Sequence, residues 1–176
     1  MNDWDLLFFR LVHVLFGVFW AGTAIFLAAF MEPTVHSLGP DGGRFMQILM
    51  QRRRLPIYLT IASVLAIASG AILYWRDSGH LHWAWVKTGP GLAFTLGGIL
   101  AVVDALIGPL VSAPTANRLG VVAQRVQAAG GPPNPADVAE LIALQARLRS
   151  ASRVGAVLLA AAAAAMAVRR YLVVRL

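Results

Sequence analysis

Residues 6–30 read LLFFRLVHVLFGVFWAGTAIFLAAF, an apolar run interrupted only by Arg10 and His13. A bilayer core of about 30 Å requires about 20 mostly apolar residues in a helix. The run is long enough to cross that core, and we predict a first span over residues 6–30. It is too long for the apolar part of a signal peptide, and Asp3 and Asp5 precede it, so we expect no cleavable signal.

Three further apolar runs predict three more spans, over residues 55–75, 88–111 and 154–171. Proline lacks a backbone N–H and disfavours helix in the residue before it. We therefore expect the first span to stop at Glu32-Pro33 and the third to end near Gly108-Pro109. The predicted fold is all-α: a four-helix transmembrane bundle forming one membrane domain over 1–176, because lipid requires every backbone group to be satisfied internally.

The composition supports a membrane protein. Hydrophobic residues make up 59% of the chain and charged residues 13%, whereas a soluble domain carries about a quarter charged residues. The net charge of +7 comes from basic residues at the ends of the apolar runs, which is typical of membrane proteins and does not indicate nucleic-acid binding. The chain has no cysteine, which excludes disulfides and thiolate metal sites. We expect a multi-pass protein of the inner or plasma membrane.

Two polar segments separate the spans. Residues 31–54 are rich in proline and glycine, and we expect a loop with a short helix from Arg44 to Met50. Residues 112–153 have apolar residues at helical spacing on both sides of the Gly130–Pro135 break. They predict one or two amphipathic helices, the second of which continues into the fourth span as one rod from about Ala136 to Tyr171.

Four spans place the polar segments 31–54 and 112–153 on one face and both termini on the other. The first face carries nine basic residues and the second carries six. The positive-inside rule therefore favours the polar segments as cytoplasmic, although the basic C-terminus argues the other way. The nine are Arg44, Arg52, Arg53, Arg54, Arg118, Arg125, Arg147, Arg149 and Arg153, and the six are Arg10, Arg76, Lys87, Arg169, Arg170 and Arg175.

His13 is the first candidate site residue, because a polar group inside a span is costly. Helical spacing puts Arg10, Gly17 and Trp20 on its face. A neutral imidazole can bind haem iron or copper, so His13 is a candidate metal ligand, with Arg10 and Trp20 beside a cofactor. The structural alternative is a histidine that hydrogen-bonds a neighbouring helix.

Lys87 starts the third span, and His80 and His82 lie just before it, at the same end of the bundle as His13. With Arg10, Trp83 and Trp85 they would form a mouth that holds the propionates of a porphyrin or another anion. The alternative is that these residues are ordinary lysine and tryptophan at headgroup level. His36 has no recognised ligand pattern around it.

Asp104 is the only acid well inside a predicted span. It predicts either a proton relay or a buried ion pair. The candidate partners are Arg118, Arg153 and the arginines at 52–54, which lie toward the same face.

The first helix, Leu11-Val-His13-Val-Leu-Phe-Gly17-Val-Phe-Trp20-Ala-Gly22, resembles the opening helix of a membrane superfamily. That superfamily contains the copper resistance D proteins, the HemJ-type protoporphyrinogen oxidases and a related set of uncharacterised integral membrane proteins. Lys87, in Trp85-Val86-Lys87, is similar to a lysine near the start of the third span in HemJ-type proteins. The resemblance implies b-type haem with His13 as axial ligand and Lys87 as its catalytic companion.

Three classes of function follow. The first is haem-associated redox or tetrapyrrole chemistry, and whether the chain is an enzyme stays open. The second is a non-catalytic membrane subunit or scaffold, a homo-oligomer or partner of another membrane protein, whose basic segments contact that partner or anionic lipid. The third is a small transporter or a copper-handling protein. Copper is disfavoured because cysteine is absent and the methionines form no MxxM cluster.

Overall fold

The computed structural model describes residues 2–130 and 132–172, and this part of the chain contains helices and turns but no strand. Four of its helices are long and apolar enough to cross a membrane. The predicted all-α fold with four spans is therefore confirmed. Met1, Gly131 and residues 173–176 lie outside the described residues, although the prediction placed them in the same domain and Gly131 in the break at 130–135.

The first span is α1 (Asp3–Phe26), which continues through the π turn η1 (Leu27–Met31) into α2 (Glu32–Ser37). The helix α3 (Pro40–Gln47) and the π turn η2 (Ile48–Arg52) lead to the second span, α4 (Leu55–Asp77). The short α5 (Trp83–Val86) precedes the third span, α6 (Gly89–Ile107), which continues through η3 (Gly108–Ser112) into α7 (Ala113–Ala128). The fourth span is α8 (Pro135–Val168), which ends in one 3₁₀ turn, η4 (Arg169–Tyr171).

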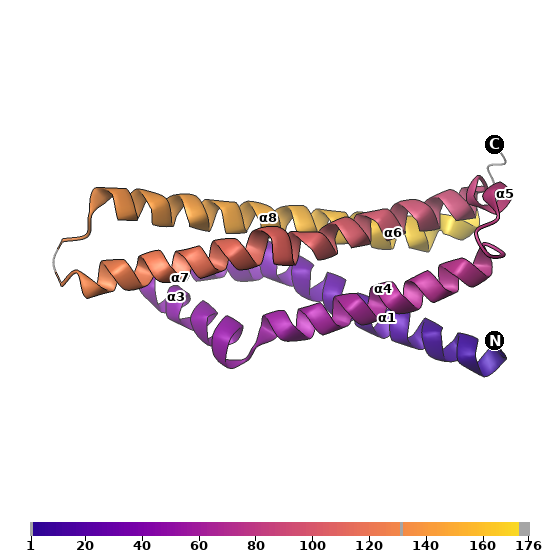
Figure 1. The fold of residues 1–176 in the computed structure, drawn as a ribbon, viewed down its shortest axis with the longest axis horizontal. Coiled ribbons are helices and arrows are strands. Elements are labelled where there is room, and N and C mark those ends of the chain that lie inside the picture. Colours follow the sequence, from indigo (N-terminus) through magenta and orange to yellow (C-terminus); the bar gives the residue numbers. More distant parts are fainter. Residues whose placement is uncertain (1, 131, 173–176) are drawn as a thin grey trace.

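The helices form two packed pairs. The main neighbour of α1 is α4, the main neighbour of α6 is α8, and α8 also contacts α1. Both ends of the described chain and the α4–α5–α6 connection lie at one end of the molecule (Figure 1). The segment α3 and the hairpin of α7 with the first half of α8 lie toward the other end, which we call the arm end. The two polar segments therefore share a face.

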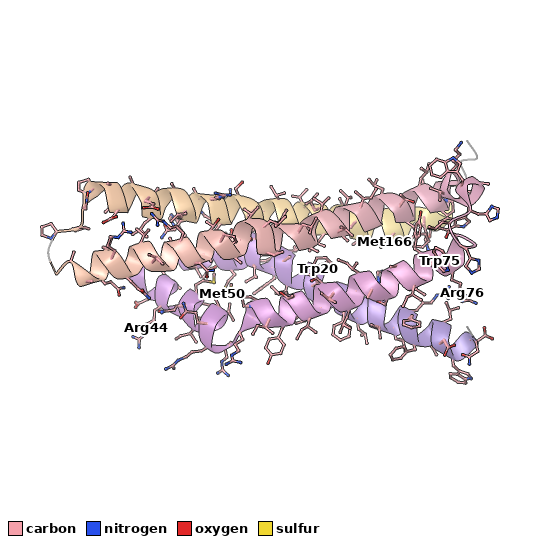
Figure 2. All side chains as sticks on the ribbon, viewed as in Figure 1. Trp20, Arg44, Met50, Trp75, Arg76 and Met166 are labelled. Atoms are coloured by element: carbon pink, nitrogen blue, oxygen red, sulfur yellow. The ribbon has the colours of Figure 1, made fainter. Side chains whose placement is uncertain are left out.

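Two close approaches hold the pairs together. Trp20 of α1 is buried against Ala62 and Ala66 of α4 and Leu159 of α8, near the middle of the molecule (Figure 2). At Gly97 of α6, an added Cβ would lie 3.1 Å from the backbone oxygen of Ala162 in α8. Small residues at these points let helix backbones approach closely, which is how spans associate in lipid.

The predicted helix stops at Pro33 and near Pro109 are wrong, because both long helices continue past these prolines. The helix that starts at Asp3 continues to Ser37, and the helix that starts at Gly89 continues to Ala128. A proline inside a helix removes one hydrogen bond and clashes with an earlier carbonyl. A π turn widens the helix locally, and in a span such an adjustment can accommodate the proline.

The same device occurs in both long helices. The turn η1 precedes Glu32-Pro33-Thr34, and η3 precedes Ala113-Pro114-Thr115 at the same spacing. In each case the threonine hydroxyl donates to the carbonyl four residues earlier: Thr34 to Phe30 at 2.8 Å and Thr115 to Val111 at 2.6 Å. Spans one and three thus leave the bundle in matching ways, a repetition that hydropathy alone does not reveal.

The polar segments are more helical than predicted. Residues 31–54 form α2, α3 and η2 instead of a loop with one helix from Arg44 to Met50. Gly39, with φ of 56°, makes the turn, and Pro40 then suits the first position of α3, where no N–H is needed. In residues 112–153 the two amphipathic helices are confirmed, and α8 forms the predicted rod into the fourth span.

Candidate functional site

His13 connects the first two spans. Its Nδ1 lies 2.8 Å from the backbone oxygen of Ala66 in α4. A carbonyl oxygen only accepts hydrogen bonds, so Nδ1 carries the proton. In the neutral ring, Nε2 is then the unprotonated nitrogen. The half-buried imidazole therefore keeps one nitrogen with a free lone pair.

Gly70 provides the space that the imidazole occupies. A Cβ at Gly70 would lie 2.8 Å from Cε1 and 2.9 Å from Nδ1 of His13. Helical spacing predicted Gly17 beside His13, but a Cβ at Gly17 would meet nothing within 4 Å. The glycine that matters was missed because it lies on another span. A weak signal existed in the small residues Ala62, Ala66 and Gly70, which recur every four residues along α4.

The other two residues predicted beside a cofactor differ in their surroundings. Arg10, one turn before His13, is exposed. Trp20 is only 7% exposed and packs in the core between α1, α4 and α8. In this structure Trp20 contributes packing, and Arg10 is the one of the two that is accessible.

Lys87 lies at the end of α5, where its Nζ is 5.7 Å from the ring centroid of Trp83. Next to it, Trp85 stacks on Phe94 of α6 with ring centroids 6.2 Å apart. Arg169 lies over the same Phe94 ring at 4.5 Å. These residues form an aromatic and cationic cluster where α4, α5, α6 and η4 meet, and Arg10, another residue of the predicted mouth, makes no ring contact there among the described residues. His80 contacts Trp75 there, with ring centroids 5.4 Å apart, and His82 is exposed.

Asp104 faces α8. Its carboxylate lies against Gly155, where an added Cβ would collide with Oδ1. Within residues 2–130 and 132–172, neither of the two ion pairs involves Asp104. Arg118, one of its predicted partners, instead pairs with Glu140 at 2.6 Å, and Arg125 pairs with Asp137 at 3.0 Å. These two pairs join α7 to the first half of α8.

We expect Asp104→Asn to change the free energy of unfolding by less than about 1 kcal/mol. Removing one partner of a buried ion pair costs about 3–5 kcal/mol, and Asp104 has no ion-pair partner among the described residues. Unfolding in mixed micelles with rising dodecyl sulfate measures the change. Gly155→Ala is the companion variant: comparing its effect in the wild type and in Asp104→Ala, which removes the colliding carboxylate, measures the coupling between the two positions. A loss of several kcal/mol for Asp104→Asn would point to an ion pair.

Glu32 makes a polar contact that was not predicted from the sequence. It lies on α2, and its carboxylate faces Ser152 of α8, with Arg149 and Arg153 nearby. Its Oε2 is buried without a hydrogen-bond partner in the described part of the chain. His36, on the same short helix, is exposed.

The predicted site residues remain separate in the structure. Among the described residues, no hydrogen bond or ion pair joins His13, Lys87 and Asp104 to one another. In the same part of the chain, no group of three or more His, Cys, Asp or Glu is placed to hold a metal ion. His13 is therefore a single potential ligand rather than part of a protein metal cluster.

The four apolar helices define a multi-pass membrane protein. The chain matches no family model, no curated protein and no solved structure. The resemblance of the first helix to the HemJ and copper resistance D superfamily stays a prediction.

Proposed function

We propose that this multi-pass membrane protein binds b-type haem through Nε2 of His13. The observation that supports the proposal is the hydrogen bond from Nδ1 to the Ala66 oxygen. Histidines that ligate metals almost always donate their other N–H to a carbonyl or carboxylate, which fixes the tautomer and orients the ring. In His13, the bond from Nδ1–H to the Ala66 oxygen is this second interaction.

Two features at His13 suit a haem. Nε2 is the kind of donor that haem iron takes. Arg10, exposed one turn away, offers a cation for a propionate. Lys87, which no hydrogen bond or ion pair joins to His13 among the described residues, stays a predicted companion of the haem. Bound haem supplies one-electron redox chemistry, while the chain's own contribution is to orient the imidazole and hold the propionates.

Absorption spectra of the detergent-purified protein, oxidised and then reduced with dithionite, test the proposal. After expression with a haem precursor, we expect a Soret band and sharpened α and β bands on reduction. His13→Ala should abolish them. His36→Ala is the matched control, because His36 is exposed on α2, and it should keep the full spectrum. A featureless wild-type spectrum, or an unchanged one for His13→Ala, would refute haem ligation by His13.

A second candidate function is a non-catalytic subunit, favoured by the hairpin of α7 and α8 at the arm end. The ion pairs Arg118–Glu140 and Arg125–Asp137 join the two helices of this hairpin. Arg147 is exposed on its surface. A stiff, basic hairpin suits docking to a partner membrane protein. A colourless protein that co-purifies with one stoichiometric partner, and releases it after Glu140→Arg, would favour this function over haem binding.

A further inference from the structure

Four arginines gather where the chain enters the second span. Arg44 lies on α3, Arg52 ends η2, and Arg53 and Arg54 lead into α4. All four are exposed. The two ion pairs of the described chain involve Arg118 and Arg125 and leave these four unneutralised. We call Arg44, Arg52, Arg53 and Arg54 the arginine patch.

The patch includes a shallow open pocket of about 280 Å³. Its lining side chains recur every three or four residues, so they share one face of the helix that runs from α3 into η2. Guanidinium and amide groups, both hydrogen-bond donors, dominate this lining. The lining residues are Arg44, Gln47, Ile48, Gln51 and Arg52.

The position of the patch places it at the level of lipid headgroups. Arg54 directly precedes Leu55, where the apolar helix α4 begins, so the patch lies where the chain enters the bilayer. Arg54 has φ of 54°, and this turn separates α3 and η2 from α4. Arg44 points away from the other helices at the outer edge of the molecule (Figure 2).

Apolar side chains accompany the arginines. Phe45 and Ile48 are 46% and 40% exposed, and Tyr58, one turn into α4, is 59% exposed. Ile48 lies on the face of Arg44 and Arg52. Phe45 lies beside that face, so this helix presents basic and apolar side chains together, as helices in the membrane interface do. Tyrosine is also enriched at that level. These neighbours favour a lipid over a soluble anion as the ligand of the patch.

We propose that the arginine patch binds the phosphate of an anionic phospholipid headgroup, with Arg44, Gln47, Gln51 and Arg52 as its direct contacts. Arginine suits this role because its planar guanidinium donates two parallel hydrogen bonds to phosphate oxygens. Arg53 and Arg54 add to the attraction, which amounts to about fivefold in affinity for each basic residue near an anionic surface. This site is independent of haem binding at His13.

The test measures binding of a fluorescent short-chain phosphatidylglycerol to the full-length protein in neutral detergent. Arg44→Gln/Arg52→Gln should weaken binding by about tenfold or more for each arginine removed, because each loses a charge-assisted hydrogen bond to the phosphate. The control, Arg76→Gln/Arg147→Gln, changes the net charge equally at exposed arginines outside the patch and should bind like the wild type. Arg52→Lys keeps the charge but loses the planar guanidinium. Its loss of affinity should therefore lie between those of the patch and control double variants.

Two competitors identify the ligand. Unlabelled phosphatidylglycerol should displace the probe, whereas phosphatidylcholine and millimolar inorganic phosphate should not. Displacement by inorganic phosphate would overturn the lipid assignment in favour of a free-anion site. If the patch and control variants lost the same affinity for the probe, net charge alone would explain the binding. That result would overturn the proposed site. Far-UV circular dichroism of each variant verifies that the helices are intact.

Discussion

Replacing Trp20 by alanine should lower the free energy of unfolding by about 3–5 kcal/mol. Trp20 is the largest side chain in the described core, where it joins α1 to α4 and α8. Its neighbours Ala62 and Ala66 are too short to fill the space that its removal leaves. In lipid the loss arises from packing, since transfer from bilayer to protein interior provides little hydrophobic gain. Unfolding with rising dodecyl sulfate in mixed micelles measures it.

Trp4→Ala is the control for this prediction. Trp4 belongs to the same helix but is 79% exposed, so its removal should change stability by less than about 0.5 kcal/mol. Equal losses for the two variants would contradict the assignment of Trp20 as the packing centre. His13→Ala, measured in the same assay, separates packing from the hydrogen bond to Ala66, whose net contribution is about 1 kcal/mol.

Gly97→Leu should destabilise the pair of α6 and α8 by about 1–3 kcal/mol, because overpacking forces helices apart. A Cβ at Gly97 would lie 2.9 Å from Cγ of Met166 and 3.1 Å from the backbone oxygen of Ala162. The methionine can move aside, but the backbone of α8 moves only if the whole helix shifts. The same unfolding assay measures the effect.

The neighbouring glycine provides the control. A Cβ at Gly98 would meet nothing within 4 Å, so Gly98→Leu should be neutral or slightly stabilising, because leucine has the higher helix propensity. A result in which Gly98→Leu is as harmful as Gly97→Leu would show that α6 tolerates no bulk on either face. A neutral Gly97→Leu would refute the close approach at Ala162.

The spans themselves are predictable from sequence because the bilayer imposes one rule: an apolar run of sufficient length becomes a helix. The ends of the helices are less predictable. Pro33 and Pro109 carry the usual signal of a helix stop, yet the helices continue through η1 and η3. Whether a proline ends a helix depends on the local hydrogen bonding around it, and a hydropathy pattern does not contain that information.

The polar residues of the candidate site could be predicted from the sequence, but the glycines that they contact could not. His13 and Asp104 are recognisable because a polar side chain in an apolar run is unusual. Their neighbours Gly70 and Gly155 are not, since a glycine in a span carries the same signal whether it faces lipid or another helix. The contacts depend on which helices pair and in which register, and both are properties of the assembled bundle.

The matching π turns also affect the mechanics of the arm end. The helix α7 has 16 residues and extends about 24 Å beyond η3, so a bend of about 10° at this compliant joint displaces its tip by about 4 Å. The neighbouring α8 has no such joint between Pro135 and Val168 and resists the same bend. The ion pairs Arg118–Glu140 and Arg125–Asp137 join α7 to this unbroken helix and therefore oppose a bend at η3.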